Sequence, residues 1–283
     1  MELRFQQVDV FSAEPFKGNP LAVVTGADSL TDAQMAAIAN WTNLSETTFL
    51  LKPTSPEADY RVRIFTPHSE RPFAGHPTLG SAYVWQSLAR SSGDAPEKDL
   101  IVQECAAGLV PIRRQASGLA FAAPPRRRTG PASQEERDRA IEALRLDTAS
   151  VLDIQWADNG PGWLVVQVDD RDTVLAIKPD WAALVGQKLG VVGEWHESPA
   201  ATGACFEVRA FVGENPGYED PVTGSLNASI GQLLIESGKA PDSYTAFQGT
   251  ALGRAGQVSV KKLGDDIWVG GAVVTRINGT ITL

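Results

Sequence analysis

The chain carries one short motif twice, and this repeat is the feature that most constrains its fold. Residues 76–81 read HPTLGS and residues 220–225 read DPVTGS, so each copy opens with an ionisable residue and Pro and closes with Gly-Ser. Each copy follows a similar strand-like stretch, VRIF at 62–65 and VRAF at 208–211. A duplicated unit with His76 in one copy and Asp220 in the other predicts two similar halves facing one site.

The size and charge of the chain narrow the classes of protein it can belong to. Its 283 residues suffice for two domains, and 43% hydrophobic with 21% charged residues is ordinary for a soluble globular protein. The net charge of -9 argues against nucleic acid as a partner, since phosphate binding requires a basic face. The three arginines at 126–128 stand beside prolines and are expected to form a solvated loop.

The sequence gives no sign of a membrane span, an export signal or a disulfide framework. No apolar run approaches the roughly 18–20 residues needed to cross a bilayer. Residues 1–11 alternate like a strand and lack the basic start and apolar centre of a signal peptide. We therefore expect a cytoplasmic protein with no membrane partner. Two cysteines, Cys105 and Cys205, make disulfides or a thiolate zinc site unexpected.

The first half alternates strand-like and helical stretches. A helix capped by Thr31 is predicted, and a second helix from about His76 to Leu88 is apolar nearly all round, which is typical of a helix buried on all sides. A turn is predicted at 17–20, and strands at 8–11, 21–24, 47–50, 60–65, 101–112 and 119–122.

The second half repeats this plan after a Pro-rich linker at 123–131. A helix capped by Ser133 runs to Leu146, a second apolar helix covers about 220–236, and strands are predicted at 163–168, 206–212 and within 257–283. The sequence therefore predicts an α+β protein of two similar domains, each a sheet wrapped round its own helix. The expected boundaries are 1–127 and 128–271, with a strand at about 272–283 as a candidate to return to the first domain, and the active-site cleft is expected between the domains.

The chemistry of the two motifs favours an anion site. Pro suits the first position of a helix, which places His76 and Asp220 at or near the N-cap. Helix N-termini offer free N–H groups and partial positive charge to carboxylates and phosphates, and the hydroxyls of Ser81 and Ser225 could add donors. Asp-Pro is also a common helix opening for structural reasons alone, but a match between two distant copies favours function. His68 and His196 have no motif around them and are expected at the surface.

Glu46 is a third candidate. It stands in the stretch LSETTF at 44–49, where a polar segment meets an apolar strand. Partial burial there would raise its pKa toward neutrality, which suits a general acid or base that exchanges protons with carbon. A capping or solvated glutamate remains the alternative.

Four segments together resemble the signatures of the phenazine-biosynthesis PhzF-like isomerase family. They are Asn19-Pro20, the SETTF stretch at 45–49, FAGHPTLG at 73–80 and EDPVTGS at 219–225, and the resemblance extends over essentially the whole chain in order. It implies the diaminopimelate epimerase-like fold, in which each of two pseudo-two-fold-related domains is a mixed sheet rolled into a barrel around a central helix.

The resemblance also implies a reaction and roles for residues. The founding member of the family isomerises trans-2,3-dihydro-3-hydroxyanthranilate without a metal or organic cofactor. By resemblance, Glu46 would carry the proton, while His76 and Asp220 would hold the substrate and tune Glu46. The remaining expected site residues would bind the carboxylate of a small anionic substrate (Gly75, Gly224 and Ser225) or line the pocket (Asn19 and Ser45). A homodimer is suggested by the family alone.

Two other readings stay open. One is an amino- or hydroxy-acid racemase or epimerase of the same fold, which would use Glu46 and a second base such as His76. Racemases of this fold use one thiol from each half, and here those places hold His76 and Asp220. The other is a ligand-binding relative without turnover. A hydrolase, a metal site and a nucleotide site are not indicated, because the chain has no Gly-x-Ser-x-Gly elbow, no metal-ligand spacing among its three histidines and no P-loop lysine.

Overall fold

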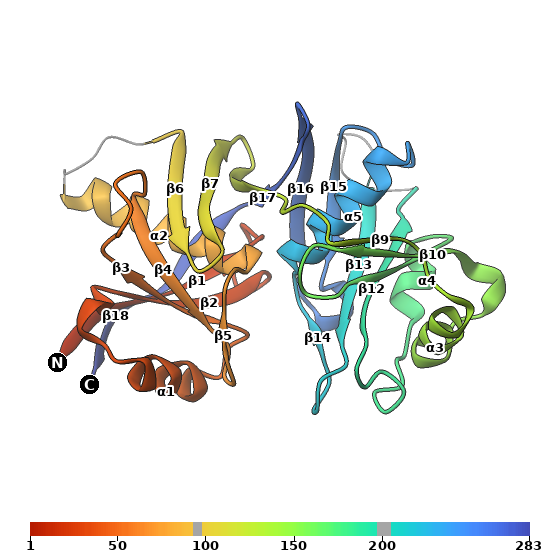
Figure 1. Ribbon diagram of the computed structural model, residues 1–283, viewed down its shortest axis with the longest axis horizontal. Coiled ribbons are helices and arrows are strands. Elements are labelled where there is room, and N and C mark those ends of the chain that lie inside the picture. Colours follow the sequence, from red (N-terminus) through yellow and green to blue (C-terminus); the bar gives the residue numbers. More distant parts are fainter. Residues whose placement is uncertain (93–97, 197–204) are drawn as a thin grey trace. The chain divides into compact units, whose positions relative to one another are not determined.

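The computed structural model of the chain describes residues 1–92, 98–196 and 205–283, with no side-chain description for 91 and 92. The chain divides into two compact units (Figure 1). The first comprises Met1–Ala122 and Gly270–Leu283, and the second comprises Ala123–Val269. Each unit is α+β, with a mixed sheet and few helices, as predicted.

The first unit is a mixed sheet with the neighbour order β18-β1-β2-β3-β4-β6-β7-β8. The pairs β2–β3 and β4–β6 are parallel and the others antiparallel, and β5 forms a hairpin with β4. Its strands are β1 (Glu2–Val10), β2 (Asn19–Thr25), β3 (Thr47–Leu51), β4 (Tyr60–Phe65), β5 (Glu70–Arg71), β6 (Leu100–Cys105), β7 (Gly108–Gln115), β8 (Gly118–Ala122) and β18 (Val273–Thr282).

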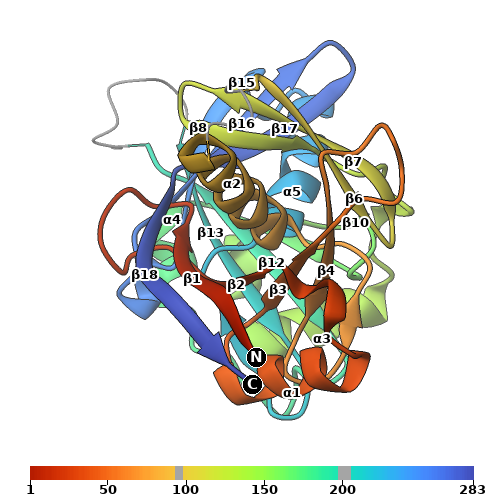
Figure 2. The same ribbon diagram turned by 90° about the vertical axis from the view of Figure 1, so that its left-hand side faces the viewer.

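Helix α2 (Gly75–Ser92) lies inside this sheet. It contacts β1, β2, β3, β4, β6, β8 and β18, and Figure 2 shows these strands around it. Gly80 allows the close approach, because a Cβ atom there would lie 2.5 Å from Cδ2 of Leu21 and 3.0 Å from Cγ2 of Val8. The prediction of a sheet wrapped round an apolar helix is confirmed for this unit.

Helix α1 (Asp32–Thr42) covers the outside of the same sheet. Thr31 caps it in a capping box with Gln34, as the sequence predicts. Its buried residues, Met35, Ile38 and Ala39, join a core cluster that includes Phe49. The helix ends at Asn43, which adopts φ 52°, and this turn directs the chain toward β3.

The second unit repeats the arrangement. Its mixed sheet has the neighbour order β9-β10-β11-β12-β13-β15-β16, with β11–β12 and β13–β15 parallel and β14 in a hairpin with β13. The strands are β9 (Arg128–Pro131), β10 (Val151–Asp158), β11 (Leu164–Val168), β12 (Lys188–Glu194), β13 (Cys205–Val212), β14 (Tyr218–Asp220), β15 (Ser243–Gln248), β16 (Gly256–Leu263) and β17 (Asp266–Gly271), whose last two residues belong to the first unit.

Among the described residues of the second unit, the α-helices that accompany this sheet are α3 (Gln134–Leu144), α4 (Arg171–Ala176) and α5 (Gly224–Glu236). Helix α5 contacts β10 and β16 and is buried along almost its whole length, as predicted. Helices α3 and α4 belong to a core cluster that contains Leu144, Val166, Val174 and Phe211. Ser133 caps α3 with Glu136 in a capping box, which confirms the predicted start of that helix.

An arginine–carboxylate fork recurs at the same place in both units. Nε and Nη2 of Arg63 on β4 donate to the two carboxylate oxygens of Glu70 on β5, both at 2.7 Å. The same two atoms of Arg209 on β13 donate to Glu219 on β14, at 2.9 and 2.8 Å. Each fork fixes the hairpin that leads the chain toward its inner helix.

Several predicted boundaries are wrong. Asn19 and Pro20 are strand residues of β2 and not part of a turn, and β1 ends at Val10 because Phe11 adopts φ 68°. The stretch 101–112, predicted as one strand, is two strands that meet in a turn at 106–107. Strand ends depend on backbone turns and on the neighbours in the sheet, and the alternation of apolar residues shows neither.

The predicted solvated loop at 126–128 is also wrong in part. Arg126 forms an ion pair with Glu236 and its side chain is only 16% exposed. Arg128 begins β9, where its guanidinium stacks 3.6 Å from the ring centroid of Trp156. The predicted linker therefore carries a sheet strand of the second unit. In the part of the chain that the structure describes, no helix is long and apolar enough to cross a membrane.

Candidate active site

Glu46 lies in the short connection between α1 and β3. The hydroxyls of Thr42 and Thr47, one on each side of this connection, hydrogen-bond at 2.8 Å. The side chain of Glu46 is 17% exposed, so the carboxylate is largely buried yet still reachable. The predicted partial burial of Glu46 is confirmed.

His76 faces Glu46 from the first turn of α2. Its Nε2 atom lies 3.5 Å from Oε2 of Glu46, and its side chain is 5% exposed. His76 is the second residue of the helix and not its N-cap, because α2 begins one residue earlier, at Gly75. The ring therefore comes from inside the first turn and points at the carboxylate.

Asn19 meets the other nitrogen of the same ring. Its Nδ2 atom lies 3.3 Å from Nδ1 of His76, and Asn19 is fully buried at the start of β2. The structure thus brings together Asn19, His76 and Glu46, three of the residues predicted from the sequence, in one continuous chain of contacts within the first unit.

Burial sets the charge of His76. Removal from water lowers the pKa of His76 to about 3, since a charged imidazolium is poorly solvated there. This effect outweighs the nearby carboxylate of Glu46, which would favour the charged ring. At neutral pH His76 is therefore an uncharged imidazole, with one ring nitrogen that donates and one that accepts.

Hydrogen bonds to two strands hold α2 in the position that aims His76. Ser81 Oγ donates to Thr48 Oγ1 on β3 at 2.9 Å, and Gln103 Nε2 on β6 donates to Thr78 Oγ1 at 3.0 Å. Ser81 is fully buried, so the expectation that its hydroxyl could serve a ligand is wrong. Its bond to β3 instead keeps α2 beside the strand that begins next to Glu46.

Ser45 and Gly75 lie next to these residues in the chain. Ser45 is half-buried beside Glu46, and Gly75 is buried as the first residue of α2. The free N–H groups of a helix start are suited to an anion. Their roles in binding substrate stay predictions.

The second motif is built differently from the first, against the sequence prediction. Asp220 ends β14, where it pairs with Ala210, and α5 begins only at Gly224 with Thr223 as its N-cap. Pro221 is therefore not the first helical residue. The carboxylate of Asp220 accepts a hydrogen bond from Thr223 Oγ1 at 2.7 Å, which ties it to the start of the helix.

Gln248, a residue that the sequence did not single out, organises this second motif. Its Oε1 atom accepts from the backbone N–H of Thr223 and from Nδ2 of Asn227, both at 2.9 Å. Its Nε2 atom donates to the carbonyl of Asp220 and to Thr223 Oγ1, also at 2.9 Å. The buried amide of Gln248 makes four hydrogen bonds and takes the place of a side-chain cap, which α5 lacks. Because these bonds hold Asp220 and Thr223 outside the helix, α5 begins only at Gly224. No local sequence signal marks Gln248, because β15 brings it from 25 residues beyond Thr223.

Ser225 and Gly224 open α5. Ser225 Oγ accepts from the indole N–H of Trp163 at 3.0 Å, and the Ser225 carbonyl accepts from Asn159 Nδ2 at 2.9 Å. Trp163 and Asn159 are further residues that sequence reasoning missed. They fix the orientation of a half-buried hydroxyl at the start of α5, and its role in binding substrate stays a prediction.

We expect Gln248→Leu to destabilise the protein by roughly 3 kcal/mol, because it leaves several buried polar groups without partners. Urea unfolding followed by circular dichroism would measure the loss. Gln257→Leu, on an exposed position of β16, is the matched control and should change stability little. Equal stability of the two variants would show that Gln248 does not hold the second motif.

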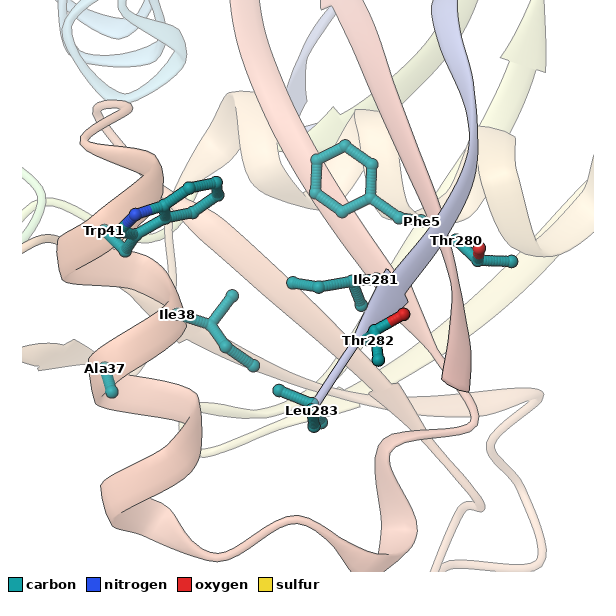
Figure 3. A pocket seen from close by; sticks show the side chains of 8 residues that line it. All are labelled: Phe5, Ala37, Ile38, Trp41, Thr280, Ile281, Thr282 and Leu283. Carbon is teal, nitrogen blue, oxygen red and sulfur yellow. The ribbon is translucent and has the colours of Figure 1, made fainter. Parts of the chain in front are cut away.

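An apolar pocket of about 520 Å³ also lies in the first unit, away from these residues. Side chains of α1, β1 and β18 and of the residue after β18 line it (Figure 3), namely Phe5, Ala37, Ile38, Trp41, Thr280, Ile281, Thr282 and Leu283. Its lining includes the hydroxyls of Thr280 and Thr282 and the indole nitrogen of Trp41, but no carboxylate side chain or imidazole. Its side chains cannot move a proton to or from carbon, so we place the candidate site at Glu46.

Other reactive groups do not gather near the helix starts. Cys105 ends β6 and Cys205 begins β13, so neither cysteine stands at the start of α2 or α5. Over residues 1–92, 98–196 and 205–283, no group of three or more His, Cys, Asp or Glu side chains could hold a metal ion. His68 and His196 are exposed, as predicted.

Comparison with known proteins identifies the relatives of this chain. The family described as phenazine biosynthesis-like protein (PhzC-PhzF) matches residues 8–279. The chain belongs to this family. It is 36% identical to Antisense-enhancing sequence 1 of Schizosaccharomyces pombe over 98% of each chain, and 34% identical to an uncharacterized isomerase of Pseudomonas aeruginosa over 100% of each. The crystal structure of the PhzF family protein of Bacillus anthracis superposes with a TM-score of 0.82 at 23% identity, covering 100% of both chains.

Membership in the PhzC-PhzF family makes the chain an isomerase of this family, as the motifs predicted. The fold is likewise that of the family, whose members share the sheet-around-helix units described above.

Proposed function

We propose that this PhzC-PhzF isomerase moves a proton between two carbons of a small cyclic substrate that bears a carboxylate, and that Glu46 carries this proton. The observation that carries the proposal is the 3.5 Å approach of the largely buried Glu46 carboxylate to a buried, neutral His76. A carboxylate in such a place is shielded from bulk water and can take a proton from one carbon and return it to another.

The other site residues have binding roles in this proposal. The starts of α2 and α5, with Gly75, Gly224 and the hydroxyl of Ser225, would bind the substrate carboxylate through N–H and O–H donors. His76 and Asp220 would hold the polar groups on the substrate ring.

The reaction needs no group beyond these side chains. Glu46 as carboxylate removes a proton from one carbon, and the electron pair of the broken C–H bond moves into the ring system. Glu46 as carboxylic acid then donates a proton to a second carbon, where a new C–H bond forms. Atoms and charges balance within the substrate and Glu46, so we propose a reaction without metal or organic cofactor.

The first substrate to test is trans-2,3-dihydro-3-hydroxyanthranilate, in D2O, with protein that has been treated with a chelator and desalted. We expect an isomer, seen by NMR and mass spectrometry, and its deuterium content at the carbon that gains hydrogen measures how far the proton on Glu46 exchanges with solvent before it is delivered. A panel of cyclic amino and hydroxy carboxylates tests the wider substrate class. Inversion of a stereocentre without a shift of the double bond would instead favour an epimerase. Tight binding of these compounds without any proton exchange would favour a binding protein and contradict the proposal.

A further inference from the structure

The two nitrogens of His76 have neighbours of opposite kinds. Nε2 faces the carboxylate of Glu46 at 3.5 Å, and Nδ1 faces the side-chain amide of Asn19 at 3.3 Å. An ionised carboxylate can only accept hydrogen bonds, whereas an amide can present either its oxygen or its NH2 group. The contact to Glu46 therefore determines which nitrogen of a neutral ring carries the proton.

A neutral imidazole has one proton to share between its nitrogens. If that proton were on Nδ1, the lone pair of Nε2 would point at the Glu46 carboxylate and the two acceptors would repel each other. With the proton on Nε2, the N–H group faces the Glu46 carboxylate across 3.5 Å, a distance at which the structure has no hydrogen bond yet, and Nδ1 can accept from a donor. Asn19 Nδ2 is the donor placed there.

We infer that Asn19 is a positioning residue that holds His76 as the Nε2–H tautomer, so that His76 acts as a hydrogen-bond donor and never as a base at Glu46. This inference rests on the proposed proton transfer by Glu46. It adds that Glu46 alone transfers the proton, while His76 only donates a hydrogen bond. The lone pair of His76 is on Nδ1, directed at the buried amide of Asn19, where no substrate can reach it.

The position of the ring proton on His76 distinguishes a two-base epimerase from a one-base isomerase. A two-base epimerase would need His76 to take a proton from carbon through Nε2, which already carries one. A one-base isomerase needs a donor at that place, which stabilises the carboxylate form of Glu46 after each proton delivery. The Asn19–His76 contact fits the second kind.

Packing around Asn19 restricts its freedom to turn away. The residue is fully buried at the start of β2, and β1 runs closely beside it. At the preceding Gly18, a Cβ atom would lie 2.2 Å from the carbonyl oxygen of Val10, so only glycine lets the chain pass at this point. Strand β2 therefore holds the side-chain amide of Asn19 at a fixed distance from α2.

The tautomer can be read directly by NMR of 15N-histidine-labelled protein. A His68→Gln, His196→Gln background leaves His76 as the one labelled residue, because the chain has three histidines and the other two are exposed. At pH 7 without substrate we expect an unprotonated Nδ1 and a protonated Nε2. Protonation of Nδ1, or an imidazolium, would overturn the inference. This NMR measurement needs no turnover, so it tests the tautomer of His76 independently of the isomerase activity.

Asn19→Asp tests the effect on catalysis. A carboxylate at this position only accepts, which draws the proton to Nδ1 or charges the ring. We expect kcat to fall by about 10²-fold or more, as a wrong histidine tautomer does elsewhere, with a much smaller change in KM. Asn278→Asp, which adds the same charge at an exposed position of β18, should leave kcat unchanged.

The kcat and the folding of Asn19→Asp each test the role of Asn19. A folded Asn19→Asp protein with the wild-type kcat would remove Asn19 from the mechanism. If that variant does not fold by circular dichroism, the wild-type spectrum alone decides whether Nε2 carries the proton.

Discussion

Replacement of Glu46 by Gln is expected to reduce proton transfer by at least about 10³-fold while the protein folds normally, since general acid–base groups contribute about 10²–10⁴-fold. Gln has the shape of Glu but cannot take a proton from carbon at neutral pH. Its amide oxygen can still accept from Nε2–H of His76, so the neighbouring contacts should survive. Solvent-deuterium incorporation and kcat would measure the effect.

A matched control separates this loss from a general effect of the substitution. Glu57→Gln changes an exposed glutamate of the same unit and should keep full activity. Substrate binding by Glu46→Gln, measured by calorimetry, should stay within a few-fold of wild type because Glu46 is not proposed to hold the substrate. Undiminished turnover in Glu46→Gln would show that another group carries the proton.

Replacement of Glu219 by Gln is expected to destabilise the protein by about 3 kcal/mol, because it leaves a buried guanidinium without its counter-charge. The side chains of Arg209 and Glu219 are 6% and 7% exposed. Nη1 of Arg209 also donates to the carbonyls of Val174 and Ile177, at 3.1 and 2.8 Å, so the arginine cannot turn to solvent without breaking those bonds. Because Glu219 precedes Asp220, activity should fall as well.

The repeat supplies the control for this experiment. Glu70→Gln alters the fork of the first unit, where Arg63 and Glu70 make the same contacts but are 22% and 38% exposed, and where Arg63 keeps Asp32 as a second partner at 2.6 Å. Ion pairs near solvent contribute at most about 1 kcal/mol, so this variant should be much closer to wild type. Urea unfolding of both variants gives the comparison. Equal losses would show that burial does not govern the strength of the forks.

Local patterns in the sequence were enough to predict much of the fold. The repeated strand–Pro–helix motif predicted two similar sheets, each around an apolar helix, and the capping residues Thr31 and Ser133 marked two helix starts correctly. These features are local, because caps and apolar periodicity act within a few residues along the chain.

The same motif gave a wrong helix start at Asp220, where contacts with distant residues outweigh the local preference of Pro221 for the first turn of a helix. His76 and Asp220 occupy equal places in the repeat, yet His76 lies inside α2 and Asp220 ends a strand. Gln248 accounts for the difference, since it binds both the carbonyl of Asp220 and the N–H of Thr223. A Pro that suits a helix start therefore did not begin one.

For the site, the sequence by itself supplied candidate residues, and the tertiary structure decided which atoms face one another and added residues such as Gln248 that no motif marks. Glu46, His76 and Asn19 were named from their motifs, because short motifs that carry reactive side chains can be recognised in the amino-acid sequence alone. Their chemistry depends on which atoms face each other across β2, α2 and the loop before β3. Burial makes His76 neutral, and the two neighbours of its ring determine which nitrogen carries the proton, because both effects come from contacts between residues far apart in the chain.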